Sequence, residues 1–329
     1  MELCRQPARG RKWWRCPAAC WRNWPLPWPK SMVLTSWRRR RVFWPNRHRL
    51  CLQRRWLTRL SKRARVPGRL DPLPEFKNPV KERLAAGQAA WGVALPDSSD
   101  LLAKMSVDTG VEFLWIDLEH RPYGPNEIRW APVICRQVGA SAMVRVPGLD
   151  ALWIKKALDI GASTIMVPQV DTADQARRAV EYCKYPPEGS RGVSPLWTLL
   201  MNVDWTDYLP AANEETAVVV QIESPQGLEN IDEIAQVEGV DVVFAGPQDI
   251  AASLGVIGQP GHPDVVKILE EFPARVGQFG KPAGITDGGY DKSAHWYDCG
   301  YRFINIGTIA HMGTQGVSEA LSKLRERET

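Results

Sequence analysis

The chain has 329 residues and a mass of 37.0 kDa, long enough for one large domain with an extension or for two smaller domains. Its formal net charge is +5, but 20 of the 42 Lys and Arg residues and only one of the 37 acidic residues lie within residues 1–70. The rest of the chain is therefore acidic, so the overall charge does not indicate an acidic partner for a folded domain. The seven cysteines are scattered and do not indicate a disulfide framework.

Residues 1–77 form an Arg- and Trp-rich stretch followed by a Pro-rich linker. The stretch lacks the period of a helix or a strand, which predicts an irregular, disordered basic extension or upstream sequence translated from an early start codon. We find no apolar run long enough for a signal peptide or a membrane span, and we expect a cytoplasmic protein. Binding to anionic membranes or nucleic acid, and a role as a transit peptide, remain alternatives for the extension.

From residue 78 onward, short apolar runs alternate with amphipathic segments. The runs have the length and composition of buried strands. There are eight of them, at residues 89–95, 112–118, 142–146, 164–170, 217–223, 241–246, 281–286 and 302–307.

The segments between these runs carry apolar residues three and four positions apart, as in residues 150–162, 172–185 and 225–239, which predicts helices. Eight strands alternating with helices in about 250 residues indicate a (β/α)8 barrel over residues 78–329. An open, doubly wound sheet is the alternative, but no G-x-G-x-x-G motif follows the first strand.

Polar residues stand where five of the predicted strands end. In a parallel barrel these ends meet on one face, where active sites of this fold are found. Each residue alone has a structural explanation, such as capping the next helix, but their coincidence favours a site. The polar residues are Asp117, Glu119, His120, Arg145, Gln169, Gln221, Glu223 and Asp249, the last in the loop after the sixth strand that also contains Gly246 and Pro247.

Two carboxylates on successive strand ends, Glu223 and Asp249, are hard oxygen ligands of the kind that Mg²⁺ or Mn²⁺ prefers. A divalent ion there would act as a Lewis acid on the keto oxygen of a 2-oxo acid and hold the enolate formed when a C–C bond breaks. Arg145 offers a planar cation for that oxygen or for a carboxylate. Asp117 can fix the tautomer of His120 and raise its basicity, which predicts an acid/base dyad.

A Schiff-base lysine would be the other way to stabilise a carbanion, and it should lie at a strand end in a dry pocket. Lys155 and Lys156 fall within a predicted helix, and Lys281 opens the seventh strand at the opposite rim. The lysine positions therefore favour a metal mechanism.

The sequence contains five motifs in this order: IDLEH (116–120), VRVP (144–147), YPPEGSRGV (185–193), VVVQIES (218–224) and VEGVDVVFAGPQDIAASLG (237–255). Together they resemble the HpcH/HpaI family of class II pyruvate aldolases, which cleave 4-hydroxy-2-oxo acids to pyruvate and an aldehyde. The family has the (β/α)8 barrel of phosphoenolpyruvate- and pyruvate-type enzymes, and its members are commonly homo-oligomers, often hexamers. The resemblance extends from about residue 78 to about residue 325.

The resemblance implies a role for each matching residue. Glu223 and Asp249 would bind Mg²⁺, Mn²⁺ or Co²⁺, and His120 with Asp117 would transfer the proton through water. Arg145 would orient the keto group, Gln221 would contact the pyruvate, and the backbone around Gly246 and Gln248 would receive the substrate carboxylate. The small-molecule partners would be a 2-oxo acid and an aldehyde, with no nucleic acid or membrane for the barrel.

The sequence departs from the family pattern at two positions. Leu118 stands where Gly is more frequent, and Gln248 where Ala is more frequent, so the acceptor pocket is the least determined part of the site. Arg191 could bind a distal carboxylate or cap a loop. A citrate-lyase-β or malyl-CoA lyase type of enzyme, and a catalytically inactive barrel with a membrane- or nucleic-acid-binding tail, are the alternative functions.

Overall fold

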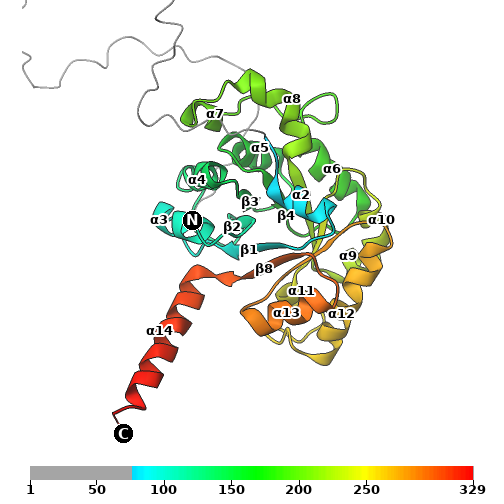
Figure 1. Ribbon diagram of the computed structural model, residues 1–329. Coiled ribbons are helices and arrows are strands. Elements are labelled where there is room, and N and C mark those ends of the chain that lie inside the picture. The colour runs from blue at the N-terminus through cyan, green and yellow to red at the C-terminus, as the bar shows by residue number, and fades with distance from the viewer. Residues whose placement is uncertain (1–75, 329) are drawn as a thin grey trace, which may run out of the picture. The chain divides into compact units, whose positions relative to one another are not determined.

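A computed structural model describes residues 76–328, and they contain a closed barrel of eight parallel strands (Figure 1). Each strand pairs with the next in the chain, and β8 pairs with β1 to close the barrel. This confirms the predicted fold, because each strand overlaps one of the eight predicted runs. The strands are β1 (Ala90–Ala94), β2 (Phe113–Asp117), β3 (Ser141–Arg145), β4 (Thr164–Val167), β5 (Ala217–Ile222), β6 (Val242–Ala245), β7 (Ala283–Thr286) and β8 (Phe303–Thr308).

Six of the strands are shorter than the predicted runs, and in two of them, β4 and β7, proline is the reason. Strand β4 ends at Val167 instead of residue 170, because Pro168 has no N–H to donate to the sheet and Gln169 turns the chain with a φ of 54°. Strand β7 begins at Ala283, directly after Pro282, instead of at residue 281. The early end of β4 turns Gln169 toward Glu223, whose carboxylate accepts a hydrogen bond from the Gln169 N–H at 3.0 Å.

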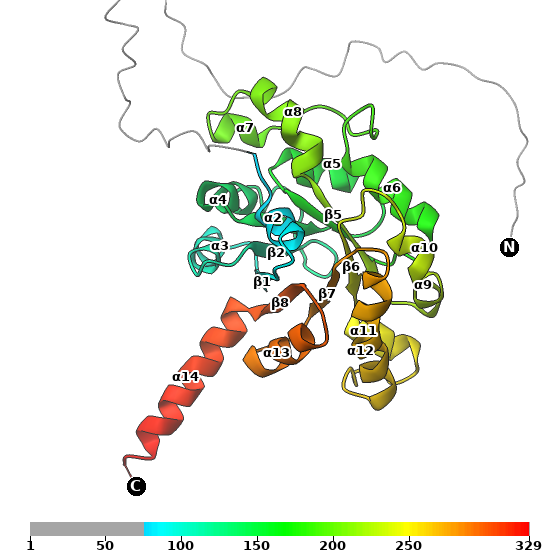
Figure 2. The ribbon, with the colours of Figure 1, turned by 45° about the vertical axis from the view of Figure 1, so that its right-hand side comes forward.

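Helices follow the strands in the chain and surround the barrel (Figures 1 and 2). They are α2 (Pro79–Ala85), α3 (Asp100–Val107), α4 (Ala131–Val138), α5 (Ala151–Asp159), α6 (Ala173–Cys183), α7 (Trp197–Leu200), α8 (Trp205–Glu215), α9 (Pro225–Glu229), α10 (Ile231–Ala235), α11 (Pro247–Ser253), α12 (Pro263–Gly277), α13 (Tyr290–Asp298) and α14 (Ile309–Arg325).

The helix predicted over residues 225–239 is two short helices, α9 and α10. They meet at Asn230, whose φ of −88° and ψ of 8° depart from helical values. Its side chain donates a hydrogen bond to the Asp171 carbonyl at 2.8 Å, so a tertiary contact holds the break. The helices predicted over 150–162 and 172–185 are confirmed as α5 and α6, and α6 begins with a capping box between Thr172 and Gln175.

Large apolar side chains fill the inside of the barrel below the site. Phe113 and Phe303 stack with ring centroids 4.2 Å apart, and Trp115 meets Phe244 edge to face at 5.5 Å. A second, larger core lies between the strands and the surrounding helices. The packed interior closes the barrel from below, so that the polar strand ends face a cavity with a solid floor.

Gly92 leaves room for this aromatic floor. A Cβ at position 92 would lie 2.2–2.3 Å from three ring atoms of Phe113. We expect Gly92→Ala to lower the free energy of unfolding by about 1–3 kcal/mol, because the Phe113 ring must move within a packed core. Urea unfolding measures this loss. Gly277→Ala, where a Cβ meets open space, serves as the control and should be neutral or stabilising by up to about 1 kcal/mol; equal effects of the two substitutions would contradict the explanation.

Helix α14 differs from the other barrel helices. Figures 1 and 2 show it pointing away from the strands, and none of its residues is buried. In the described part of the chain no helix is long and apolar enough to cross a membrane. The predictions for the basic extension fall almost entirely on residues outside the described range, and the boundary at residue 77 stays a prediction.

Candidate active site

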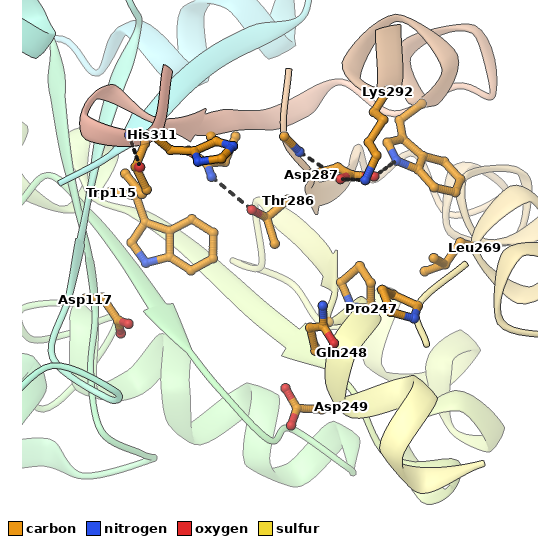
Figure 3. Close-up of a pocket in the computed structure, with 18 of the residues that line it drawn as sticks. Trp115, Asp117, Pro247, Gln248, Asp249, Leu269, Thr286, Asp287, Lys292 and His311 are labelled. Carbon is orange, nitrogen blue, oxygen red and sulfur yellow. Dashed lines mark hydrogen bonds and ion pairs between the residues drawn. The ribbon is translucent and has the colours of Figure 1, made fainter. Parts of the chain in front are cut away.

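The carboxyl ends of the strands surround a cavity of about 920 Å³ (Figure 3). Asp117, Gln248 and Asp249 lie on one side of it, and Thr286 and Lys292 lie on another. Seven of the eight predicted site residues line this cavity. They are Asp117, His120, Arg145, Gln221, Gly246, Gln248 and Asp249.

Glu223 is the eighth predicted site residue. It is only 6% exposed and lies behind Gln221, which lines the cavity. Its carboxylate accepts hydrogen bonds from the Gln221 side chain at 2.5 Å and from the Gln169 backbone at 3.0 Å. The structure thus brings together residues from strands that are far apart in the sequence.

Arg145 and Asp117 form a two-pronged ion pair at neighbouring positions of β3 and β2. The Arg145 Nε and Nη2 atoms donate to the two Asp117 oxygens at 2.9 and 2.8 Å. Burial raises the pKa of the Asp117 carboxyl, but the Arg145 hydrogen bonds and charge outweigh it and hold the pKa below its ordinary value. The guanidinium also lies 4.9 Å over the Trp115 ring. Arg145 is therefore held in one orientation at the cavity wall.

Glu119, a strand-end residue to which the sequence assigned no role, also belongs to this charged group. Its Oε2 atom lies 3.0 Å from Arg145 Nη1, an ion pair without hydrogen-bond geometry, and 3.6 Å from His120 Nε2. Burial raises the Glu119 pKa, against the Arg145 and His120 charges, and the Asp117 and Asp249 charges raise it further. The signal was present in the sequence, because Glu119 stands between two predicted site residues.

His120 is placed differently from the predicted dyad. In the described residues, both Asp117 oxygens are bonded to Arg145, and the carboxylate nearest to the His120 ring is that of Glu119. The His120 side chain is 62% exposed and lines the cavity. A proton carried by the imidazole therefore has Glu119 as its nearest acceptor, while the catalytic roles of His120 and Asp117 stay predictions.

Three carboxylates crowd the region of Glu223. Burial together with the charges of Asp249 and Glu119 raises the pKa of Glu223 to about 7, although the Gln169 hydrogen bond and Arg145 oppose the shift. Asp249 lies in the first turn of α11, directly after β6. Such an excess of negative charge fits a bound cation, which would compensate the repulsion between the carboxylates.

Gly246 allows the close packing around this carboxylate. A Cβ at position 246 would lie 2.6 Å from Glu223 Oε2 and 2.9 Å from Gln221 Nε2. The donor set of Glu223 and Asp249, with oxygen ligands and an adjacent open cavity, suits a hard divalent ion that keeps water or substrate oxygens in its other positions. The residues present therefore fit a divalent metal ion.

The raised pKa of Glu223 predicts how stability depends on pH. The unfolded carboxyl ionises near its ordinary value of 4.5, whereas the folded one keeps its proton until about pH 7. The stabilisation from the bound proton is thus complete below the unfolded value and is lost as the pH rises through 7. For protein treated with EDTA, we expect the Glu223 carboxyl to make the free energy of unfolding about 1 kcal/mol lower at pH 8 than at pH 6.

Urea unfolding at both pH values checks this expectation, with Glu223→Gln as the matched control that cannot ionise. The variant should lose the Glu223 share of the pH dependence, while the contributions of all other groups stay the same. An identical pH dependence in the two proteins would show that Glu223 does not titrate in this range.

The substrate carboxylate is predicted to bind the backbone around Gly246 and Gln248, and the structure shows which amides there are already bonded within the protein. The Gly246 N–H is already bonded to the Ile222 carbonyl at 3.1 Å, so this amide is not free. Pro247 has no N–H, and the Ile250 N–H donates to the Gly246 carbonyl. As first-turn amides of α11, those of Gln248 and Asp249 have no acceptor within the helix, so they are the ones that remain for an anion.

The β7–β8 wall of the cavity, formed by Thr286, Asp287, Lys292 and Asn305, was not predicted from the sequence (Figure 3). Asn305 is 3% exposed and donates to the Thr286 hydroxyl at 2.9 Å, while its Oδ1 atom is buried without a hydrogen-bond partner in the described structure. Thr286 is the last residue of β7, so its position at a strand end was a signal that could have found it, whereas Asn305 lies inside β8, where nothing in the pattern marks it as a pocket residue. An unsatisfied acceptor at this wall suits a ligand hydroxyl.

Lys292 also lines the cavity, from the first turn of α13. Its side chain is 65% exposed and forms an ion pair with Asp287 at 2.9 Å (Figure 3). A Schiff-base lysine requires a desolvated amine, which this one is not. Lys292 therefore does not suit a Schiff-base mechanism, and the lysine positions still favour a metal mechanism.

Arg191, for which two roles were open, lies outside the cavity lining. It is 3% exposed, forms an ion pair with Asp159 at 3.3 Å and stacks over the Tyr185 ring at 4.2 Å. These contacts fix the loop that contains it, so Arg191 has a structural role here.

The model of the HpcH/HpaI aldolase/citrate lyase family matches residues 91–308 of the chain. The chain belongs to this family. A hydroxypyruvate/pyruvate aldolase of Deinococcus radiodurans is 41% identical to it over 247 residues, which cover 73% of this chain and 86% of that protein. A 5-keto-4-deoxy-D-glucarate aldolase of Shigella boydii is 35% identical over 260 residues, covering 77% of this chain and all of that protein.

Among solved structures, an HpcH/HpaI aldolase/citrate lyase family protein from Burkholderia cenocepacia superposes with a TM-score of 0.69. It is 33% identical, and the match covers 76% of this chain and 100% of that one. This HpcH/HpaI family member is a metal-dependent aldolase, a carbon–carbon lyase. The relatives favour the aldolase over both alternatives, the acyl-CoA lyase and the inactive barrel.

Proposed function

We propose that the protein reversibly cleaves a 4-hydroxy-2-oxo acid to pyruvate, or hydroxypyruvate, and an aldehyde, with Glu223 and Asp249 holding Mg²⁺, Mn²⁺ or Co²⁺. The observation that carries the proposal is the crowding of carboxylates at the cavity, where burial, Asp249 and Glu119 raise the pKa of Glu223 to about 7. When bound, the ion supplies Lewis-acid stabilisation of the developing negative charge on the keto oxygen.

The protein's own residues bind and orient the 2-oxo acid beside this pair of carboxylates. Arg145, held by Asp117 and Glu119 and stacked on Trp115, presents a fixed cation to the keto oxygen or carboxylate. Gln221 faces the same cavity while it bonds Glu223. The free first-turn amides of α11 receive the carboxylate group.

His120 is proposed as the group that removes the proton from the 4-hydroxyl in the cleavage direction, directly or through water. It lies at the exposed side of the cavity, so its proton exchanges with solvent. Glu119 Oε2 lies 3.6 Å from His120 Nε2, close enough to orient the imidazole. Asp117 does not contact the imidazole in this proposal. Its carboxylate accepts hydrogen bonds from Arg145 and so positions the guanidinium.

For the aldehyde we propose a polar, hydroxyl-bearing compound. The β7–β8 wall offers the unsatisfied Asn305 Oδ1 atom together with the Thr286 hydroxyl and Lys292. Among the relatives, the hydroxypyruvate/pyruvate and the keto-deoxy sugar acid aldolases have oxygen-rich substrates by name. An apolar aldehyde would leave these polar groups unpaired.

The test is a screen of 4-hydroxy-2-oxo acids that differ in the hydroxylation of the aldehyde part, with pyruvate or hydroxypyruvate as the detected product. Each substrate is assayed with Mg²⁺, Mn²⁺ and Co²⁺ and after EDTA treatment. We expect cleavage that needs added metal and is fastest with hydroxylated substrates. Failure of every substrate with every metal would refute the proposed reaction, and full activity after EDTA would refute the metal.

We further propose a homo-oligomer, in which α14 packs against another subunit. Supporting this, α14 has no buried residue, and three of its apolar side chains, spaced four and three positions apart, are exposed: Val317 (62%), Leu321 (46%) and Leu324 (60%). This spacing places them on one face of the helix, which is the pattern of a buried contact. The number of subunits, six in the expectation from the sequence, is part of the proposal.

The apolar face of α14 predicts the effect of a charge on assembly. We expect Leu321→Asp to shift the protein toward smaller species in analytical ultracentrifugation, because a buried carboxylate without a partner opposes association. Ser322→Asp, which adds the same charge to the same helix at the next position, is the control and should assemble normally. A monomeric wild-type protein, or an unchanged Leu321→Asp assembly, would contradict the proposal.

The barrel from residue 78 onward is proposed to carry the activity, acting in the cytoplasm on small molecules, without a membrane or nucleic-acid partner. Every predicted site residue that reaches the cavity comes from this part of the chain. No function is assigned to residues 1–77.

A further inference from the structure

A group of three metal-binding side chains lies between α12 and α13, apart from the carboxylates of the active site. Glu270 comes from α12, His295 from α13, and Cys299 is the C-cap residue of α13. One ligand atom from each residue lies within 4.8 Å of the other two. Among the described residues, this is the one group of three His, Cys, Asp or Glu side chains that meets so closely.

The spacing within the group is that of a tetrahedral metal site. His295 Nε2 lies 3.5 Å from Glu270 Oε1 and 3.7 Å from Cys299 Sγ. Zinc bonds of about 2.0–2.1 Å to nitrogen, 2.0–2.2 Å to oxygen and 2.3 Å to sulfur place tetrahedral ligands about 3.3–3.7 Å apart. Two edges of the tetrahedron are thus already formed, and the third closes by a small movement of exposed side chains.

The helices hold two of the three ligands in place. His295 and Cys299 are four residues apart on one face of α13, the separation that brings helical side chains together. The His295 ring also packs edge-on against Trp296, with centroids 4.7 Å apart. Trp296 is in turn fixed by donating a hydrogen bond from its indole nitrogen to Asp287 at 3.0 Å.

The local charges favour a cation. Partial burial raises the pKa of the Cys299 thiol, and the negative charges of Glu270 and Asp298 raise it further. A divalent ion would compensate the two carboxylates and release the thiol proton, since the thiolate is the ligand form. The His295 and Glu270 side chains are about half exposed, which leaves an ion a path from solvent and room for a water ligand.

We propose that Glu270, His295 and Cys299 form a binding site for a borderline-soft divalent cation such as Zn²⁺, with water as the fourth ligand. Its sulfur and nitrogen donors select zinc or cobalt, whereas the oxygen donors of Glu223 and Asp249 suit harder ions. His295 also lines the large cavity. The protein would therefore carry two chemically different metal sites, one within the cavity and one at its edge.

Titration of the full-length, reduced protein with Co²⁺ tests this site, because cobalt replaces zinc and reports sulfur ligation by a thiolate charge-transfer absorption. We expect the wild-type band to saturate with Co²⁺ and to disappear on addition of Zn²⁺. The Cys299→Ser variant should lose the band, and His295→Gln should weaken the Co²⁺ affinity at least about tenfold, since it removes a direct ligand. Cysteines elsewhere in the chain are present in both wild type and Cys299→Ser, so the difference between them isolates Cys299.

Two control variants separate this site from other sources of the band. His262→Gln alters a partly buried histidine outside the group and should keep the absorption. Glu223→Gln should keep it as well, because the carboxylate site has no sulfur ligand, so the result is independent of the proposed reaction. Absence of a thiolate band in the wild-type protein, its persistence in Cys299→Ser, or its loss in His262→Gln would overturn the proposal.

Discussion

The Glu223→Gln variant is expected to lose metal-dependent aldol cleavage by about 10³-fold or more, because Lewis-acid stabilisation contributes several kcal/mol to the transition state. Gln keeps the size of Glu and can still contact Gln169 and Gln221, so the fold should survive. It removes the negative charge that the proposed ion needs. The loss should therefore be accompanied by loss of tight Mn²⁺ binding, measured by calorimetry on EDTA-treated protein, with no loss of stability at pH 8.

Asp249→Asn should behave in the same way, since it removes the second carboxylate. Glu229→Gln is the matched control, because Glu229 is exposed on α9 and does not line the cavity. It should keep both metal affinity and turnover. If Glu223→Gln bound Mn²⁺ as the wild type does, the ion would have to be held elsewhere; normal turnover with normal binding would exclude Glu223 from the site.

The Arg145→Leu variant is expected to lose both stability and catalytic activity. Two carboxylates, Asp117 and Glu119, would lose the cation that compensates them at low exposure. We expect the free energy of unfolding at pH 8 to fall by about 3 kcal/mol, as for other broken buried ion pairs. The pKa of Asp117 should rise, because burial raises it and Arg145 is what lowers it. Cleavage should slow by about 10²-fold or more, since the active site loses the fixed cation that contacts the substrate.

The double variant Arg145→Leu with Asp117→Leu separates the two effects. Removing both charges should restore part of the stability, because no buried carboxylate of this pair stays unpaired, but it should not restore cleavage. Arg177→Leu, which breaks an exposed ion pair with Asp174, is the control and should cost about 0–1 kcal/mol. A fully stable Arg145→Leu protein, or recovery of activity in the double variant, would contradict the role assigned to Arg145.

The barrel could be predicted from the sequence because its signals are local. Each strand is a short apolar run between turn residues, and the eight runs recur at the spacing of βα units, which a closed parallel barrel requires. The errors are at boundaries set by backbone chemistry or by distant contacts. Pro168 ends β4 early, and Asn230 divides a helix by bonding Asp171, a residue 59 positions away.

The site could be predicted in part, because parallel strands bring their carboxyl ends to one rim. Asp117, Arg145, Gln221 and Asp249 reach the cavity for that reason. The β7–β8 wall was not predicted, although Thr286 ends β7 as other site residues end their strands. Asn305 could not have been found, since it lies within β8 and is distinguished from other strand residues only by lining the cavity. The Glu270, His295 and Cys299 group could not be predicted either, because Glu270 comes from α12 and only the packing of α12 against α13 brings it to the His295 and Cys299 pair.

The sequence by itself determined the kind of fold, the rim at which the site lies and the residue types available there, because periodicity and strand order are local properties of the chain. Only the tertiary structure decided which charges are partners. It pairs Asp117 with Arg145 through strand register, and it places Glu119 nearest to the His120 ring. It also raises the pKa of Glu223 to about 7 through burial and the charges of Asp249 and Glu119. These effects depend on distances in space, which the order of residues along the chain does not give.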